Sequence, residues 1–330
     1  MLGVFELYLR FTATYSVDYY TGSLIGDKDA NRAGERIEYP YGTVFRNSLG
    51  FADEEFDLTS TKPRIGYFGD SVAYGVGAGY PYRVTELVQA AAPAFEHWNL
   101  GSGLGSRFKG DRILSLVDRF DLAWVVYLLN MNDIHAPVNS PEFSSSERLV
   151  RWIRRQVDRI NFLRGRSYLY SFVRIKAVTA LQSLGYGAGG YYAYEMWPEE
   201  NTSVLEGFAA DINALGHQLA QRGVGFCVIL FPYEMQVSEE AARIYRGMGF
   251  RWEDGFESGK TQRRLAELIR SAEVFDARSA FELAATGIGE MFVYDRGDMI
   301  DWNHPNRAGH AVIAKDFLDT KACSFLREQR

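Results

Sequence analysis

The feature that most limits how this chain of 330 residues can fold is a regular alternation of strand-like and helix-like patterns. Five short apolar runs are nearly continuous, which is typical of parallel strands covered by helices on both faces. They span residues 64–69, 95–100, 123–129, 224–231 and 273–277. Amphipathic patterns predict helices over residues 82–92, 107–119, 203–222, 261–271 and 306–318. We therefore predict a three-layer α/β/α fold around a mostly parallel sheet of about five strands.

Two regions fall outside this alternation. We predict a single domain over residues 1–330, in which residues 1–60 wrap the core and residues 136–202 form a helical insertion. The arginine-rich part of the insertion, "ERLVRWIRRQVDRINFLRGR", can be a lid over an active site or a solvated helix on the flank of the domain. The basic residues between 147 and 176 suggest proximity to a membrane or to an anionic polysaccharide.

The N-terminal stretch "MLGVFELYLRF" is apolar but short, and Glu6 and Arg10 interrupt it. It is either the end of a membrane anchor or an ordinary amphipathic helix. A membrane-anchored extracytoplasmic or periplasmic location is favoured over a cytoplasmic one, and the oligomeric state is left open.

The net charge of −6 argues against nucleic acid as a partner. Cys227 lies in an apolar run far from Cys323, so we expect a buried, inert thiol.

A candidate nucleophile follows the first predicted strand. In "RIGYFGDSVAYG", Ser71 stands where ligands bind in parallel sheets, at the carboxyl end of a strand, although it can also be a turn residue or a helix cap. A serine nucleophile needs a base within hydrogen-bond reach and a third group that orients the base. His304 can be this base, and Asp301 precedes it by three residues, a spacing that places two side chains together on a tight turn or a first helical turn.

An acyl-transfer site also needs hydrogen-bond donors for the oxyanion that forms at the ester carbonyl. Asn132 follows the third predicted strand and can point its amide into such a site. The run "WNLGSGLGS" follows the second strand, and its glycines permit close approach of a free backbone N–H. Because the carboxyl ends of parallel strands are neighbours in space, we expect these donors to lie near Ser71 and His304.

Four short blocks, in this order, resemble the SGNH, or GDSL-type, hydrolases. They are "GDS" at 69–71, a glycine of "NLGSGLG", "NxND" at 130–133 and "DxxH" at 301–304. The resemblance covers roughly residues 44–135 and 224–320. It implies a flavodoxin-like sheet, with Ser71 as the nucleophile, His304 as the base and Asp301 as the partner that orients the base.

The same resemblance implies an oxyanion hole of three donors. These are the backbone N–H groups of Ser71 and Gly103 and the side-chain amide of Asn132. The spacing of the glycine run differs from the family pattern, so Gly105 is a rival to Gly103.

Three further residues near these blocks are candidates for the pocket or its support. Asp70 and Asp133 match the family's letters, and we expect their carboxylates to bind backbone amides of nearby loops. His135 either lines the pocket or lies in a loop.

The predicted function is hydrolysis of small acyl esters, above all acetyl esters, through an acyl-serine intermediate. The substrate would be a small molecule or a carbohydrate, and the chemistry requires neither a metal nor another cofactor. Two alternatives stay open: an O-acyltransferase that acts on a polysaccharide with the same triad, and a non-catalytic binding or assembly protein.

Overall fold

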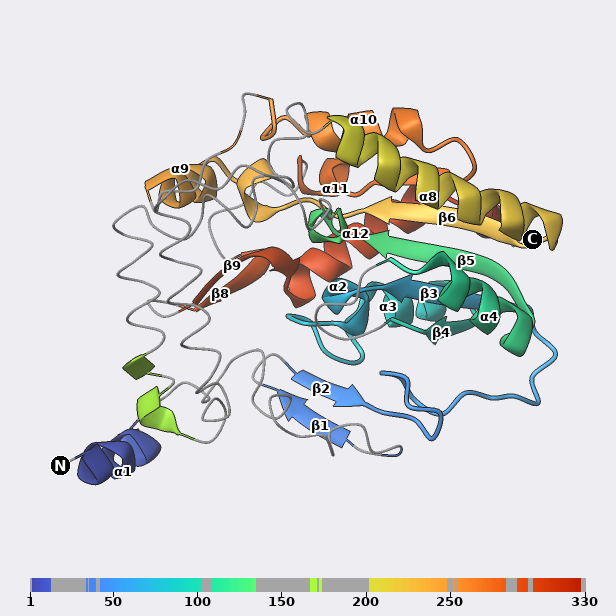
Figure 1. Cartoon of the computed structure of the whole chain (residues 1–330). Helices are drawn as coiled ribbons and strands as arrows, with labels where there is room; N and C mark the ends of the chain where they lie inside the picture. The colour runs from blue at the N-terminus through green and yellow to red at the C-terminus, as the bar shows by residue number, and fades with distance from the viewer. Residues whose placement is uncertain are drawn as a thin grey trace.

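The centre of the protein is a parallel sheet of five strands, seen here in a computed structural model (Figure 1). The strands are β3 (Arg64–Gly69), β4 (Glu96–Asn99), β5 (Leu122–Leu129), β6 (Gly225–Leu230) and β7 (Glu273–Asp276). Their order in the sheet is β4–β3–β5–β6–β7, which is the 2-1-3-4-5 order of flavodoxin-like folds. The predicted fold class is therefore confirmed. The structure describes residues 2–12, 34, 36–39, 42–101, 108–134, 167–170, 172–173, 202–247, 252, 255–282, 290–295 and 299–327.

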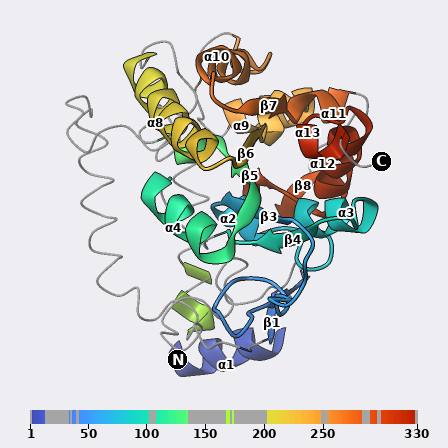
Figure 2. The same ribbon diagram turned by 90° about the vertical axis from the view of Figure 1, so that its right-hand side faces the viewer.

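Helices cover both faces of the sheet, which explains why its strands are apolar without alternation. Val125 of β5 packs in one core and Val126 in the other, because successive residues of a strand point to opposite faces. Figure 2 shows α4 and α8 on one side of the sheet and α3 and α12 on the other. The five main helices have the following bounds: α3 (Val84–Ala91), α4 (Gly110–Phe120), α8 (Thr202–Gln221), α10 (Lys260–Leu268) and α12 (Arg307–Asp319).

α1 (Leu2–Thr12) covers the N-terminal stretch for which an amphipathic helix was one of the two predicted alternatives. Several short elements around this frame were not predicted from the sequence. They are β1 (Arg36–Tyr39), β2 (Gly42–Phe45), α2 (Ser71–Tyr74), η1 (Met131–Asp133), η3 (Glu234–Gln236), α9 (Glu239–Gly247), α11 (Arg278–Glu282), β8 (Phe292–Asp295), β9 (Met299–Pro305) and α13 (Ser324–Arg327). β1 and β2 form an antiparallel hairpin, as do β8 and β9. Among the described residues, no helix combines the length and the apolar character needed to cross a bilayer.

The expectation of an unpaired Cys227 thiol is wrong. Cys227 of β6 forms a disulfide with Cys323, which lies just before α13. Both residues are buried, and their Cα atoms are 6.1 Å apart, within the usual range for a disulfide. The pairing depends on the C-terminal segment packing against the central sheet, and a separation of 96 residues gives no sign of that.

Candidate active site

Ser71 lies at the abrupt end of β3. Gly69 has a φ of +149°, and a Cβ atom there would lie 2.6 Å from the carbonyl oxygen of Leu128, so only glycine lets the chain turn this close to β5. Asp70 then caps α2, because its Oδ1 atom accepts the Val72 N–H at 3.0 Å. Ser71 is thus the first residue of α2 and not its N-cap, so its hydroxyl is not used to cap the helix.

His304 meets Ser71 at this edge of the sheet. The Nε2 atom of His304 lies 2.7 Å from the Oγ atom of Ser71, a hydrogen-bond distance that permits proton transfer. The two residues are 233 positions apart in the chain, and both are buried: His304 is 6% exposed and Ser71 is 2% exposed. The structure therefore brings together the predicted base and the predicted nucleophile.

The setting of His304 differs from the sequence expectation. We expected Asp301 and His304 on a loop or turn before α12, but both lie in β9. In a regular strand, residues three positions apart point to opposite faces, so the turn argument for their pairing does not apply. The Asp301 side chain lies outside the described part of the structure, and its role as the partner of His304 stays a prediction.

β9 is not a regular strand at this point. Phe292 of β8 pairs with Pro305, and Tyr294 pairs with Ile300. Residues 301, 302, 303 and 304 therefore stand opposite a single residue of β8, which makes a large bulge. Bulges redirect side chains and leave backbone groups outside the ladder, and this one carries His304 to Ser71.

Asp70 contacts the reacting groups directly. Its predicted bond to a nearby backbone amide is present, at Val72. Its Oδ2 atom also lies 3.2 Å from the Ser71 Oγ atom, and its carboxyl accepts a hydrogen bond from the Asn132 side chain. Burial raises the pKa of Asp70, against the opposing effects of these bonds and of His304. A hydroxyl carries one proton and donates to one acceptor at a time, so the shorter distance favours His304 over Asp70 as its acceptor.

Asn132 is held in a single 3-10 turn, η1, directly after β5. The turn is closed by Asp133, whose Oδ2 atom accepts the Asn130 backbone N–H at 3.3 Å, as expected of that carboxylate. A primary amide has two N–H bonds. One donates to Asp70, and the second can serve a ligand oxygen. Within the described residues, the Oδ1 atom of Asn132 is buried without a hydrogen-bond partner.

The glycine-rich run begins close to the nucleophile. The N–H of Gly101 donates to Oδ1 of Asn99 at 3.0 Å, and a Cβ atom on Gly101 would lie 2.7 Å from the Cβ atom of Ala73. The chain thus leaves β4 packed against α2. Gly103, Gly105 and His135 lie outside the described residues, so the third oxyanion donor and the pocket histidine stay predictions.

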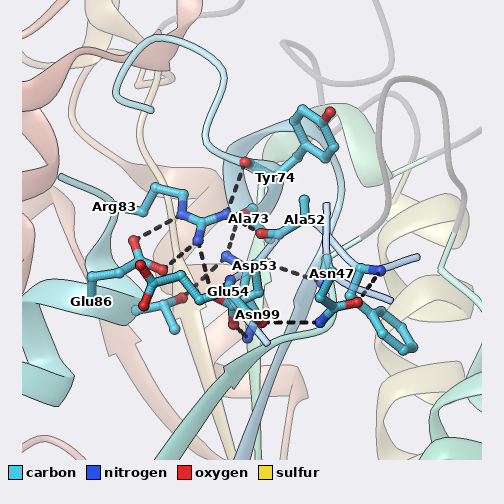
Figure 3. A network of polar contacts seen from close by, with 12 residues as sticks. Asn47, Ala52, Asp53, Glu54, Ala73, Tyr74, Arg83, Glu86 and Asn99 are labelled. Atoms are coloured by element: carbon cyan, nitrogen blue, oxygen red, sulfur yellow. Dashed lines mark hydrogen bonds and ion pairs between the residues drawn. The ribbon is translucent and has the colours of Figure 1, made fainter. Parts of the chain in front are cut away.

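A buried group of charged side chains lies beside α2, and sequence reasoning did not find it (Figure 3). We call Asp53, Arg83, Glu86 and Asn99 the support cluster. Arg83 is 1% exposed; its guanidinium donates to Glu86 at 2.8 Å and to Asp53 at 3.4 Å. It also donates to the carbonyl oxygen of Tyr74, the last residue of α2, at 3.3 Å.

Asn99 completes the support cluster from the end of β4. Its side chain donates to the carbonyl oxygen of Ala73 at 2.6 Å, and its backbone N–H donates to Asp53 at 2.7 Å. Burial raises the pKa of Asp53 well above its ordinary value; Arg83 opposes this shift and the negative charge of Glu86 adds to it. Two carboxylates thus share one guanidinium behind the helix that begins with Ser71.

Metal ligands are not clustered in the described part of the chain: no three histidine, cysteine, aspartate or glutamate side chains there come together in a way that could hold an ion.

Comparisons with known proteins give likenesses of fold at low identity. No protein-family model matches the chain, and no curated protein matches it in sequence. An α/β hydrolase from the metagenome of Lake Arreo is 18% identical, with 81% of this chain and 98% of that chain covered and a TM-score of 0.38. A variant of a Geobacillus acetyl-xylooligosaccharide esterase is 18% identical, with 78% and 93% covered and a TM-score of 0.39.

A member of the lipolytic G-D-S-L family from Veillonella parvula is 13% identical, with 78% of this chain and 96% of that chain covered and a TM-score of 0.35. Identities below 25% and TM-scores below 0.5 decide neither the family of this chain nor its chemistry. Both questions rest on the geometry of its own site.

Proposed function

We propose that the protein is a serine ester hydrolase that works through an acyl-enzyme on Ser71. The observation that carries this proposal is the buried contact of 2.7 Å between Ser71 Oγ and His304 Nε2, at the carboxyl edge of a parallel sheet. A hydroxyl paired with an imidazole is the arrangement that makes serine nucleophilic at neutral pH. The Asn132 amide, tied to the neighbouring Asp70, adds a donor beside this pair.

In the first half of the reaction, His304 Nε2 takes the proton from Ser71 as the Oγ atom bonds to the ester carbonyl carbon. The carbonyl oxygen becomes an oxyanion, which accepts hydrogen bonds from the second N–H of Asn132 and from the backbone N–H of Ser71. The C–O bond to the alcohol then breaks, and His304 returns the proton to the departing oxygen.

In the second half, water takes the place of the alcohol. His304 removes a proton from the water as it attacks the acyl-serine, and the Ser71 oxygen leaves with that proton. Asp301 is proposed to hold the imidazole in the required tautomer, and Gly103 or Gly105 to supply the third oxyanion donor. No step requires a metal or another cofactor.

The proposed substrates are small acyl esters, above all acetyl esters, of small molecules or carbohydrates. This part is supported by the resemblance of the four sequence blocks around Ser71, Asn132 and His304 to the SGNH hydrolases. The proposed contact of residues 147–176 with a membrane or an anionic polysaccharide involves residues that mostly lie outside the described part of the structure.

The test is a panel of chromogenic esters from acetyl to octanoyl, assayed with the wild type, Ser71→Ala and Ser279→Ala. Ser279 is a matched control, because it is an exposed serine whose hydroxyl bonds the carbonyl oxygen of Asp276 and the carboxylate of Asp316. We expect turnover that decreases with chain length, is lost in Ser71→Ala and is retained in Ser279→Ala. A fluorophosphonate probe should label Ser71 of the wild type.

Turnover that persists in Ser71→Ala, or no turnover together with no labelling of the wild type, contradicts the proposal. Adding an oligosaccharide to the same assay separates hydrolysis from acyl transfer. Acetylated oligosaccharide formed in preference to acetate would identify a transferase that uses the same residues.

A further inference from the structure

One buried side chain joins the segment that carries the proposed oxyanion donor to the segment that carries the proposed base. Asn130 is the residue between β5 and η1, and it is 0% exposed. Its Nδ2 atom donates to the backbone carbonyl oxygen of Asn303 at 3.0 Å, across 173 positions of sequence. Asn303 directly precedes His304.

The bulge in β9 explains why this carbonyl needs a side-chain partner. Residues 301–304 stand opposite one residue of β8, so the regular ladder does not satisfy all of their backbone groups. A buried backbone carbonyl without a partner is costly, and Asn303 is nearly buried. The amide of Asn130 meets this need at the position next to His304.

β8 and β9 form a separate hairpin outside the five-stranded sheet, on the side toward which β5 and β6 point (Figure 1). The place of His304 relative to Ser71 therefore depends on bonds between this hairpin and the sheet. The bond from Asn130 to Asn303 is such a connection, and it is anchored at the end of the central strand β5.

We infer that Asn130 is a positioning residue that sets the His304 imidazole against Ser71 by holding the bulge of β9. This inference rests on the proposed function. Asn130 touches neither the substrate nor the reacting atoms in this scheme. It acts through the carbonyl of Asn303, and its loss would let His304 move away from the proton-transfer distance.

The backbone bonds of Asn130 separate this role from a general structural one. Its N–H donates to the Asp133 carboxylate, and its carbonyl oxygen accepts the Asp133 N–H at 2.9 Å. Both bonds survive a change of side chain, so Asn130→Ala should keep η1 and Asn132 in place. Asn130→Asp has nearly the same shape, but an ionised carboxylate cannot donate to Asn303.

The experiment compares Asn130→Ala, Asn130→Asp and the control Asn213→Ala in the full chain, with an acetyl ester as substrate. Asn213 bonds the carbonyl oxygen of Leu268 at 2.9 Å and the N–H of Arg270 at 2.7 Å, on the α8–α10 side of the protein. We expect kcat to fall roughly 10- to 100-fold in both Asn130 variants, with KM changed less than about threefold. Asn213→Ala should lower the melting temperature with kcat unchanged.

The pH dependence of kcat adds a second measurement, which a loss of stability alone would not change. The carboxyl group introduced by Asn130→Asp regains a donor O–H when it is protonated. The kcat of Asn130→Asp divided by that of Asn130→Ala should therefore rise as the pH is lowered. A constant ratio, or kcat values of the folded variants equal to that of Asn213→Ala, would overturn the inference. If Asn130→Ala does not fold, the kcat of Asn130→Asp relative to that of Asn213→Ala decides: a constant ratio across pH, or equal kcat values, would overturn the inference.

The two proposals fail in distinguishable ways. Wild-type protein without Ser71-dependent turnover overturns the proposed function and this inference together. Ser71-dependent turnover that is insensitive to both Asn130 substitutions overturns only the inference.

Discussion

Two groups of polar side chains around α2 use their hydrogen bonds in opposite ways. In the support cluster, Arg83 and Asn99 each satisfy several acceptors, including two carbonyl oxygens of α2 itself. In the group at the sheet edge, one hydroxyl proton of Ser71 faces two acceptors, and the buried side-chain oxygen of Asn132 has no partner within the described part of the chain. Matched groups stabilise a fold, whereas unmatched ones are costly and are kept where a ligand completes them. Substitutions in the two groups should therefore separate activity from stability.

The largest expected effect is the loss of turnover in Ser71→Ala. Removal of a serine nucleophile should lower kcat by a factor on the order of 10⁴ to 10⁶, because only binding and the oxyanion donors remain. The free energy of unfolding should change little. We would measure initial rates with the acetyl ester and urea unfolding of the same preparation. A large loss of stability in this variant would break the division between the two groups.

The next effect belongs to the support cluster. Arg83→Met removes the guanidinium that faces the buried carboxylates of Asp53 and Glu86, and it should cost about 3–5 kcal/mol in the free energy of unfolding. The control is Arg222→Met, which breaks a solvent-exposed pair with Asp118 and should cost less than about 1 kcal/mol. Urea unfolding measures both variants. Equal losses in the two would show that the buried cluster does not hold α2.

Asn132→Ala tests the edge group without touching the nucleophile. The loss of one oxyanion donor should lower kcat by a factor of roughly 10² to 10³, which corresponds to about 3–4 kcal/mol of transition-state stabilisation. The free energy of unfolding should fall by only about 1–2 kcal/mol, because the substitution removes the hydrogen bond to the Asp70 carboxyl, while the amide oxygen of Asn132 has no partner to lose among the described residues. Steady-state kinetics at saturating ester gives the answer. A folded variant with wild-type turnover would exclude Asn132 from the oxyanion hole.

A smaller effect is expected from acid, through two buried histidines. Burial is the main cause that lowers the pKa of His97 to about 4 and of His310 to about 3, whereas an unfolded histidine titrates near 6.5. Between pH 6.5 and these values, the unfolded state binds more protons, so stability falls as the pH falls. The slope is at most about 1.4 kcal/mol per pH unit for each histidine. Urea unfolding from pH 7 to pH 5 measures the net slope, to which the raised pKa of Asp53 contributes with the opposite sign, and His97→Gln should reduce the part of the slope due to the histidines. An unchanged slope in that variant would argue against a neutral, buried His97.

The sequence predicted the sheet and the main helices well, because each strand is an apolar run long enough to be recognised by itself. Ser71 and His304 were found for a related reason. One follows a strand end, the other precedes a clear helix, and parallel topology brings such places together. The physical argument for pairing Asp301 with His304 was wrong in its geometry, since it assumed a turn where the chain forms a bulged strand.

The missed features share one cause. Arg83 lies in "PYRVTEL", Asn99 in "HWNLG" and Asn130 in "LLNMN", and no local pattern marks any of them as buried. Arg83 bonds Asp53 30 positions away, Asn99 bonds Ala73 26 positions away and Asn130 bonds Asn303 173 positions away, so these roles exist only after the strands have assembled. The same is true of the disulfide between Cys227 and Cys323.

The smallest expected effect concerns Glu6, a carboxylate that has several hydrogen bonds, as the support cluster does, but lies near solvent. Glu6 of α1 accepts hydrogen bonds from Ser167, Tyr168, Leu169 and Arg10 at 2.8 to 3.1 Å. Desolvation raises its pKa, but these bonds outweigh that effect and lower the pKa to about 2. The contribution of Glu6 to stability is therefore present above pH 4.5 and is lost as the pH falls toward 2.

Because this site is accessible to solvent, Glu6→Gln should cost at most about 1 kcal/mol at pH 7, seen as faster hydrogen exchange in α1 with unchanged exchange in β5. Arg10→Gln serves as the control, because it removes one of the four donors and should have a still smaller effect. A cost for Glu6→Gln as large as that for Arg83→Met would mean that the number of hydrogen bonds governs these clusters. If Glu6→Gln instead costs much less than Arg83→Met, the difference in the free energy of unfolding is due to burial. In the buried support cluster, removing one charge leaves its partner charges uncompensated.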